Sequence, residues 1–296
     1  MNNIKYKHSQ KANIFIHILF IALSLLCVLP LILAVSVSFT DNLALTRYGY
    51  SFIPKVFSLD AYKYVLNNAA SMIKAYGVTI FVTVVGTLLS TLVISMYAFV
   101  ISRKDFKRRS LFTFIMFFTM LFNGGTVSWY LVCTGIGLRN NLLALILPYC
   151  FNAWYCVIMK TFFATNVPSS LIESAKIDGA GEYMIFFKIV LPISLPGLAT
   201  IALFSCLGYW NDWWLPLMLV PDNSLSNIQY LLYRIMSNVQ AISSNSNLTT
   251  SLSMVELPTE SVRMALCVIA MGPIVLAYPF FQRYFIEGLT IGAIKG

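Results

Sequence analysis

Apolar residues recur along the chain in uncharged runs that are long enough to cross a lipid bilayer, which takes about 20 residues as a helix. The runs lack the ten-residue alternation of a membrane barrel. Each run predicts a helix, because lipid offers no partner to backbone N–H and C=O groups. The sequence therefore predicts an all-α integral membrane protein with six transmembrane helices, at residues 14–39, 72–101, 111–132, 142–163, 198–220 and 264–284.

The composition excludes an ordinary soluble enzyme. Of 296 residues, 58% are hydrophobic and 10% are charged, whereas soluble domains carry about 25% charged residues. Lysines precede the first apolar run, as in a signal peptide. That run is much longer than a signal peptide's apolar region of about 7 to 15 residues, so we expect a retained membrane anchor.

The net charge of +9 follows from membrane topology rather than from nucleic-acid binding. When the six spans are threaded with the N-terminus inside, thirteen of the twenty Lys and Arg residues lie inside, led by a cluster in the short segment 103–109. Positive charge favours the cytoplasmic side of a membrane. We therefore expect a multi-pass membrane protein with both termini cytoplasmic, extracytoplasmic loops at 40–71 and 221–263, and a cytoplasmic loop at 166–196.

Neither a metal centre nor a catalytic site is predicted. The six cysteines show no metal-ligand spacing, and both histidines lie near the N-terminus. The phosphate-binding pattern G-x-x-x-x-G-K-[ST] is absent from the sequence. The sequence therefore offers no recognisable phosphate-binding loop.

The cytoplasmic loop carries detailed helix signals. Ser170 and Glu173 have the spacing of a capping box, which predicts that a short helix begins at Ser170. A second helix is expected from residue 182 to 190, ended by Leu191 and Pro192. Small residues give the first helix a face that another surface can approach closely: Ala175, Gly179 and Ala180.

Residues 173–196, E-S-A-K-I-D-G-A-G-E-Y-M-I-F-F-K-I-V-L-P-I-S-L-P, resemble the EAA loop of ABC importer permeases. Ser174 stands where the family usually has alanine. The stretches G-Y-W-N-D-W-W at 208–214 and G-L-T-I-G-A-I-K-G at 288–296 resemble the carbohydrate branch of these permeases, so the resemblance covers nearly the whole chain. Positions that match the EAA pattern are Glu173, Ala175, Asp178, Gly179, Ala180, Phe186, Ile189, Leu191, Pro192 and Pro196.

The resemblance implies a location in a bacterial cytoplasmic membrane. It also implies that residues 166–196 form a coupling loop that docks on a cytoplasmic ATPase. The implied partners are a second homologous permease, two ATPase subunits that hold ATP and Mg, and an extracytoplasmic sugar-binding protein, with no cofactor on this chain. Glu173 would pair with a basic residue of the ATPase, which is compatible with a capping role. The expected coupling residues are Glu173, Ser174, Ala175, Asp178, Gly179, Ala180, Leu191, Pro192 and Gly296.

A charged residue inside a span is a candidate for function, because it costs at least about 2.5 kcal/mol to insert. Asp212 lies within the predicted span 198–220, surrounded by aromatic residues and an amide, and this combination suits sugars. In one continuous helix Tyr209 would share a face with Asp212 and Trp213, and Trp210 would share another with Trp214. An interfacial aromatic belt or hydrogen bonds to a partner helix would explain the same residues. The pathway candidates here are Tyr209, Trp210, Asn211, Asp212 and Trp213.

A second pathway candidate interrupts the span that begins at residue 111. Paired glycines after Asn123 loosen a helix and expose carbonyl groups, although a plain kink would explain them equally. Trp129 and Tyr130 follow one to two turns later. The candidates are Asn123, Gly124, Trp129 and Tyr130.

Taken with the resemblance, the sequence predicts one half of the translocation pathway of an ATP-driven importer of oligosaccharides or polysaccharide fragments. An ion-coupled secondary transporter is the alternative, and an intramembrane enzyme is a third class. A secondary transporter usually needs inverted repeats, and the two halves of the sequence show none. An intramembrane enzyme needs a nucleophile and a base at the same depth in the membrane, which the sequence does not offer.

Overall fold

The computed structural model of the chain describes residues 10–67, 69–244 and 260–293. This part consists of helices and the segments that connect them, with an isolated antiparallel bridge between Thr40 and Phe57. The chain divides into two compact units. The first joins residues 1–69 to 235–271, and the second joins residues 70–234 to 272–296. Helices α14 (Ile228–Ser244) and α15 (Glu260–Ala293) each contribute residues to both units.

The first unit begins with the long apolar helix α1 (Gln10–Ser38). Two short helices follow, α2 (Asn42–Tyr48) and α3 (Asp60–Asn67). Phe39 holds this connection together, since its ring stacks on that of Phe57 at 5.6 Å and on that of Tyr62 at 4.8 Å between ring centroids.

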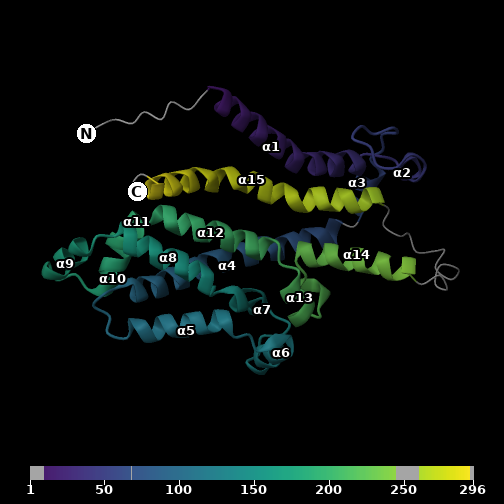
Figure 1. The fold of residues 1–296 in the computed structure, drawn as a ribbon. Helices are drawn as coiled ribbons and strands as arrows, with labels where there is room; N and C mark the ends of the chain where they lie inside the picture. Colours follow the sequence, from purple (N-terminus) through teal and green to yellow (C-terminus); the bar gives the residue numbers. More distant parts are fainter. Residues whose placement is uncertain (1–9, 68, 245–259, 294–296) are drawn as a thin grey trace. The chain divides into compact units, whose positions relative to one another are not determined.

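In the second unit the long helix α4 packs against α8 and α12 through a shared apolar cluster (Figure 1). Ser90 of α4 and Ser205 of α12 share a hydrogen bond of 3.3 Å. The helices of this unit other than α14 and α15 are α4 (Ala69–Ser102), α5 (Arg109–Leu121), α6 (Gly125–Gly135), α7 (Leu143–Ile146), η1 (Leu147–Tyr149), α8 (Ala153–Asn166), α9 (Ser169–Ile177), α10 (Glu182–Met184), η2 (Ile185–Val190), α11 (Leu191–Ile193), α12 (Leu195–Trp210), α13 (Trp214–Leu219) and η3 (Asn223–Leu225).

Two apolar clusters form the core of the second unit. One joins the C-terminal part of α4 and the middle of α8 to the coupling loop, and includes Phe99, Met159, Ile172, Phe186 and Val190. The other joins the middle of α4 to α7, α12 and α13, and includes Val82, Leu145, Tyr209, Leu215 and Leu219. Helix α4 therefore contributes to both clusters.

The described helices supply two spans by length and apolar composition, Ile14–Ser38 and Ala69–Ser102. The number rises to four if two bent pairs each count as one span. One pair joins α7 and η1 to α8 with a bend of 52°, and the other joins Glu182–Ile193 to α12 with a bend of 84°. The fold is thus that of an all-helical membrane protein.

Two of the predicted spans are not single continuous helices, and the first is broken at the paired glycines where the sequence indicated an interruption. Residues 111–132 form two helices, α5 and α6, and residues 198–220 form α12 and α13 with a break at 211–213. Polar side chains stop both helices by bonding to the backbone: Asn123 Oδ1 accepts from the Gly125 N–H at 2.8 Å, and the Asp212 carboxylate accepts from two N–H groups of α13. The expected loop at 221–263 contains α14.

Candidate functional site

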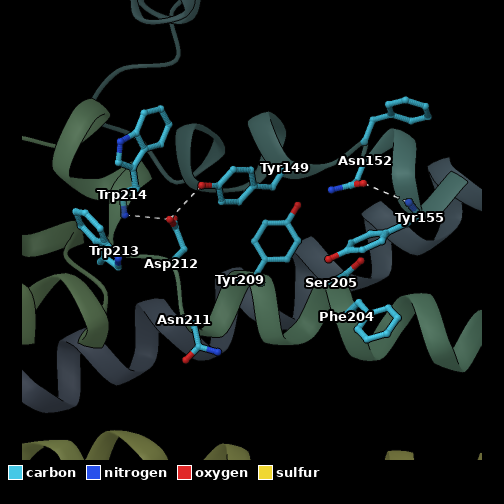
Figure 2. Close-up of a pocket in the computed structure, with 12 residues that line it drawn as sticks. Tyr149, Asn152, Tyr155, Phe204, Ser205, Tyr209, Asn211, Asp212, Trp213 and Trp214 are labelled. Atoms are coloured by element: carbon cyan, nitrogen blue, oxygen red, sulfur yellow. Dashed lines mark hydrogen bonds between the residues drawn. The ribbon is translucent and has the colours of Figure 1, made fainter. Parts of the chain in front are cut away.

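A cavity of about 480 Å³ lies in the second unit, where the break after α12 faces the connection between α7 and α8. Figure 2 shows its side chains converging from these segments. The only charged group among the lining residues is the carboxylate of Asp212, and the rest are aromatic, amide, hydroxyl or small. The lining residues are Tyr149, Phe151, Asn152, Tyr155, Phe204, Ser205, Gly208, Tyr209, Asn211, Asp212, Trp213 and Trp214.

Asp212 joins the two sides of this pocket. Its Oδ1 accepts hydrogen bonds from the backbone N–H groups of Trp214 at 3.0 Å and Leu215 at 3.2 Å, and from the Tyr149 hydroxyl at 3.4 Å. The backbone carbonyl of Asp212 accepts from the Asn227 side-chain amide. The Asp212 carboxylate therefore satisfies the first two N–H groups of α13, whose N-cap position is Trp213, and its 7% exposed side chain lies at the pocket wall.

Aromatic rings form most of the pocket wall. The Tyr209 hydroxyl donates to the Ile146 carbonyl at 2.8 Å, which fixes a ring whose side chain is almost fully buried. Tyr155 stacks on Phe204 at 5.8 Å between ring centroids. Trp213 stacks on Tyr233 at 4.5 Å and remains 41% exposed. This wall offers flat apolar faces beside amide and carboxylate oxygens, a set that matches the C–H faces and hydroxyls of sugars.

Four of the predicted pathway residues meet in this pocket: Tyr209, Asn211, Asp212 and Trp213. Because α12 ends at Trp210, the expected separation of these aromatics onto two faces of one helix is wrong, and Trp213 and Trp214 line the same pocket. Trp210 is buried and does not line it.

The candidates near residue 123 lie elsewhere. Asn123 and Gly124 are exposed at the break between α5 and α6, and Tyr130 is half-buried in the second apolar cluster. Trp129 lies against Trp214 at 4.6 Å between ring centroids, so it packs against a pocket residue without lining the pocket itself.

The predicted span 142–163 supplies four pocket residues that are not among the predicted pathway candidates: Tyr149, Phe151, Asn152 and Tyr155. The chain bends here because Asn152 caps α8, with its Oδ1 accepting from the N–H groups of Trp154 at 2.9 Å and Tyr155 at 3.2 Å. Pro148, four residues before that Asn, was the signal that this span is interrupted.

The coupling loop begins differently from the expected capping box. Helix α9 starts at Ser169, directly after Pro168, and no side-chain hydrogen bond caps it. The N-cap residue is Pro168, so Ser170 is the second residue of the helix. Glu173 therefore lies five residues after the N-cap instead of the three that a capping box requires. The predicted capping box is wrong because the extended backbone of Pro168 starts the helix one residue earlier.

The small residues of α9 do not form one outward face. Ala175 is buried and Ala180 is half-buried in the first apolar cluster, so the surface that closely approaches these two small residues is the core of this chain. Gly179 is exposed with a φ of +81°, and ends the turn after α9 as expected. The solvent-facing positions of this segment include Glu173, Ser174, Ile177 and Asp178.

The second helix of the loop does not end at Pro192. It runs from Glu182 through a π-helical turn at Ile185–Val190 and on to Ile193. The Leu191 N–H bonds to the Phe186 carbonyl five residues back, and this widened turn relieves the clash of the Pro192 ring with the preceding turn. Leu191 is half-buried and Pro192 is exposed, whereas Gly296 lies outside the described residues.

Four charged side chains of the loops beside α9 contact one another. We call Arg103, Asp105, Lys176 and Glu182 the charge cluster. Hydrogen bonds from Arg103 and Lys176 hold the pKa of Asp105 well below its usual range. Hydrogen bonds to Asp105 and Glu182 raise the pKa of Lys176. Among the described residues, no group of three His, Cys, Asp or Glu side chains forms an arrangement that could hold a metal ion.

Comparison with known proteins agrees with this architecture. Residues 103–291 match the family described as "Binding-protein-dependent transport system inner membrane component". The chain is 40% identical over 273 residues to the polygalacturonan/rhamnogalacturonan transport system permease protein YtcP of Bacillus subtilis, covering 92% of this chain and 94% of that protein. It is 36% identical to Protein LplC of Bacillus subtilis over 100% of both chains.

A solved structure agrees as well. A chain of a bacterial ABC transporter involved in the import of the acidic polysaccharide alginate superposes with a TM-score of 0.80 at 27% identity, covering 96% of this chain and 100% of that one. These similarities give no support to an ion-coupled secondary transporter or to an enzyme. The chain therefore belongs to the binding-protein-dependent transport system inner membrane component family, the membrane-embedded permease subunits of ABC importers.

Proposed function

We propose that this permease forms half of the translocation pathway of an importer of oligosaccharides or polysaccharide fragments. The observation that carries this proposal is the pocket beside Asp212, where aromatic faces surround one carboxylate and several amide and hydroxyl groups. Sugars are recognised by such combinations. The names of YtcP and of the alginate importer, which concern polysaccharides, support the same substrate class.

Within this pathway Tyr209, Asn211, Asp212 and Trp213 contact the sugar, joined by Tyr155 from α8. Among the described residues, no Lys or Arg lines the pocket. A uronic acid carboxylate beside Asp212 would therefore meet like charge without a counter-ion. This subunit consequently binds the hydroxyl and C–H faces of a sugar, and any acidic group faces away from it.

The coupling loop docks on a cytoplasmic ATPase subunit, with Glu173 and Asp178 among its contacts. Both side chains are exposed, and Ile177 between them is 87% exposed, which suits a surface that a partner covers. Ala175, Ala180 and Leu191 support the docking surface from within.

The complete importer contains this chain, a second homologous permease, two ATPase subunits that bind ATP and Mg, and an extracytoplasmic sugar-binding protein. ATP binding closes the ATPase pair and opens the pathway outward, and hydrolysis resets it. In the membrane the chain has six spans and both termini are cytoplasmic. This arrangement agrees with the excess of cations in the segments assigned to the inside.

Co-purification of the tagged chain from its native membrane, followed by mass spectrometry, tests this proposal. We expect an ATPase, a second permease and a binding protein, and loss of the ATPase from Glu173→Lys. Asp222→Lys is the control, because it makes the same charge change at an exposed position of the loop assigned to the opposite side. Recovery of the chain alone would overturn the proposal, and the ligand of the binding protein would identify the sugar.

A further inference from the structure

The charge cluster ties three segments of the polypeptide together. Arg103 follows the last residue of α4, Asp105 lies two residues later, Lys176 is in the last turn of α9, and Glu182 begins α10. Each base contacts both acids. Lys176 Nζ lies 2.7 Å from Asp105 Oδ2 and 3.1 Å from Glu182 Oε1, and Arg103 Nη1 lies 2.9 Å from Glu182 Oε2. Arg103 also contacts both carboxylate oxygens of Asp105.

Arg103 is the buried member of this cluster. Its side chain is 11% exposed, whereas those of the other three are 40% to 59% exposed. The guanidinium lies 5.4 Å from the centroid of the Phe99 ring, which in turn lies 5.4 Å from that of Phe186 in the π-helical turn. A planar guanidinium that bonds two carboxylates and stacks on an aromatic ring has one favourable orientation.

Helix α4 also contacts the wall of the pocket. Gly86 of α4 lies against the ring of Tyr209, which lines the pocket. Seventeen residues separate Gly86 from Arg103, about 25 Å of helix at 1.5 Å per residue. Farther along α4, the Thr79 hydroxyl accepts from the Ile228 N–H at 2.9 Å and donates to the Ala75 carbonyl at 2.7 Å. Helix α4 thus connects the charge cluster to the pocket wall.

We propose that the charge cluster fixes the coupling loop to the end of α4, so that a displacement of α9 moves α4 and, through Gly86, the Tyr209 wall of the pocket. Arg103 is the positioning residue. Apolar contacts of Ile172 and Ala175 also join α9 to the core. Because such contacts are not directional, they permit sliding, and the directional bonds of Arg103 set the register. This inference rests on the proposed docking of the ATPase on α9.

The test uses the assembled transporter in proteoliposomes and measures sugar transported per ATP hydrolysed. For Arg103→Met we expect the ATPase to remain bound and to hydrolyse ATP, while transport per ATP falls about fivefold or more. Arg103→Lys keeps the positive charge but loses the planar guanidinium that bonds both carboxylates. Its transport per ATP should therefore lie between that of Arg103→Met and that of the wild type. Glu182→Gln changes an exposed group and should lower the ratio in the same direction even if Arg103→Met fails to fold.

Arg108→Met is the matched control, since Arg108 lies in the same loop, is exposed and forms no ion pair with any described residue. We expect Arg108→Met to transport as much sugar per ATP hydrolysed as the wild type. An unchanged ratio in both Arg103→Met and Glu182→Gln would overturn the inference, as would loss of the bound ATPase from these variants, which would make the cluster a docking element. If the wild-type chain itself binds no ATPase, the proposed function fails instead.

Discussion

The ring of Tyr209 lies so close to Gly86 that any side chain at this glycine would collide with it. A Cβ built on Gly86 would lie 2.6 Å from Tyr209 Cζ, nearer than non-bonded carbon atoms approach in proteins. The Tyr209 ring cannot retreat freely, because its hydroxyl donates to the Ile146 carbonyl at 2.8 Å. Glycine at this position of α4 therefore permits the pocket wall to form.

Gly86→Ala should destabilise the protein by about 1–3 kcal/mol, the usual cost of overpacking, and should reduce transport by displacing Tyr209. Thermal unfolding in detergent and transport in proteoliposomes measure the two effects. The control is Gly77→Ala in the same helix, where the added Cβ meets nothing within 4 Å. Equal behaviour of the two variants would show that the contact with Tyr209 is not needed.

Substitutions of Asp212 separate its capping role from its charge. Asp212→Ala removes the acceptor of the Trp214 and Leu215 N–H groups, which should cost about 1 kcal/mol, and transport should fall while the ATPase stays bound. Asp212→Asn keeps an oxygen acceptor and should keep the fold. Transport by Asp212→Asn then measures the effect of removing the negative charge while an oxygen acceptor is kept. Full transport activity in both variants would show that Asp212 is not part of the pathway.

The aromatic wall predicts a preference at position 213. Trp213→Phe retains a flat face for sugar stacking, whereas Trp213→Leu does not, so uptake should fall more in Trp213→Leu. Labelled-oligosaccharide uptake measures both. Trp154→Leu is the control, because Trp154 is 59% exposed and does not line the pocket. A loss of uptake in Trp154→Leu equal to that in Trp213→Leu would contradict a specific role for Trp213.

Two glycines of the coupling loop differ in backbone conformation but not in available space. A Cβ at either Gly179 or Gly181 meets nothing within 4 Å, yet only Gly179 has a positive φ, +81°. Gly179→Ala should therefore cost about 1–2 kcal/mol and loosen the turn after α9, whereas Gly181→Ala should be nearly neutral. Thermal unfolding and ATPase co-purification distinguish them, and two neutral variants would mean that this turn adapts without strain.

The charge cluster should be insensitive to pH near neutrality. The folded pKa of Asp105 is lowered from 3.8, so its contribution is present above about pH 4 and is lost as the pH falls toward the folded value. The pKa of Lys176 is raised from 10.5, so its contribution is present below that pH and is lost as the pH rises through the folded value.

Transport per ATP, compared between wild type and Lys176→Met from about pH 5.5 to 8.5, should therefore show a constant difference. The groups that face Lys176 are Arg103, Asp105 and Glu182. A difference that titrates near pH 7 would show that another group controls the cluster.

Much of this protein follows from local sequence. Apolar composition predicts α1 and α4, because a long uncharged run in lipid has helix as its stable conformation. The coupling loop was recognisable because its spacing of Glu173, Gly179 and Pro192 is local, and the positive φ of Gly179 could be expected from the residue type. The breaks within 111–132 and 198–220 were marked by Asn123 and Asp212, although the predicted spans ran through them.

Tertiary structure alone decided which residues meet. The pocket depends on Tyr149 reaching Asp212, 63 residues along the chain, and the charge cluster depends on Lys176 reaching Asp105, 71 residues away. It also decided that Ala175 faces inward, because burial depends on what packs against α9 rather than on residue size. Helical periodicity and propensity are properties of neighbouring residues, so they specify helices and their ends. Contacts between distant segments depend on how those helices pack, and only the folded chain specifies them.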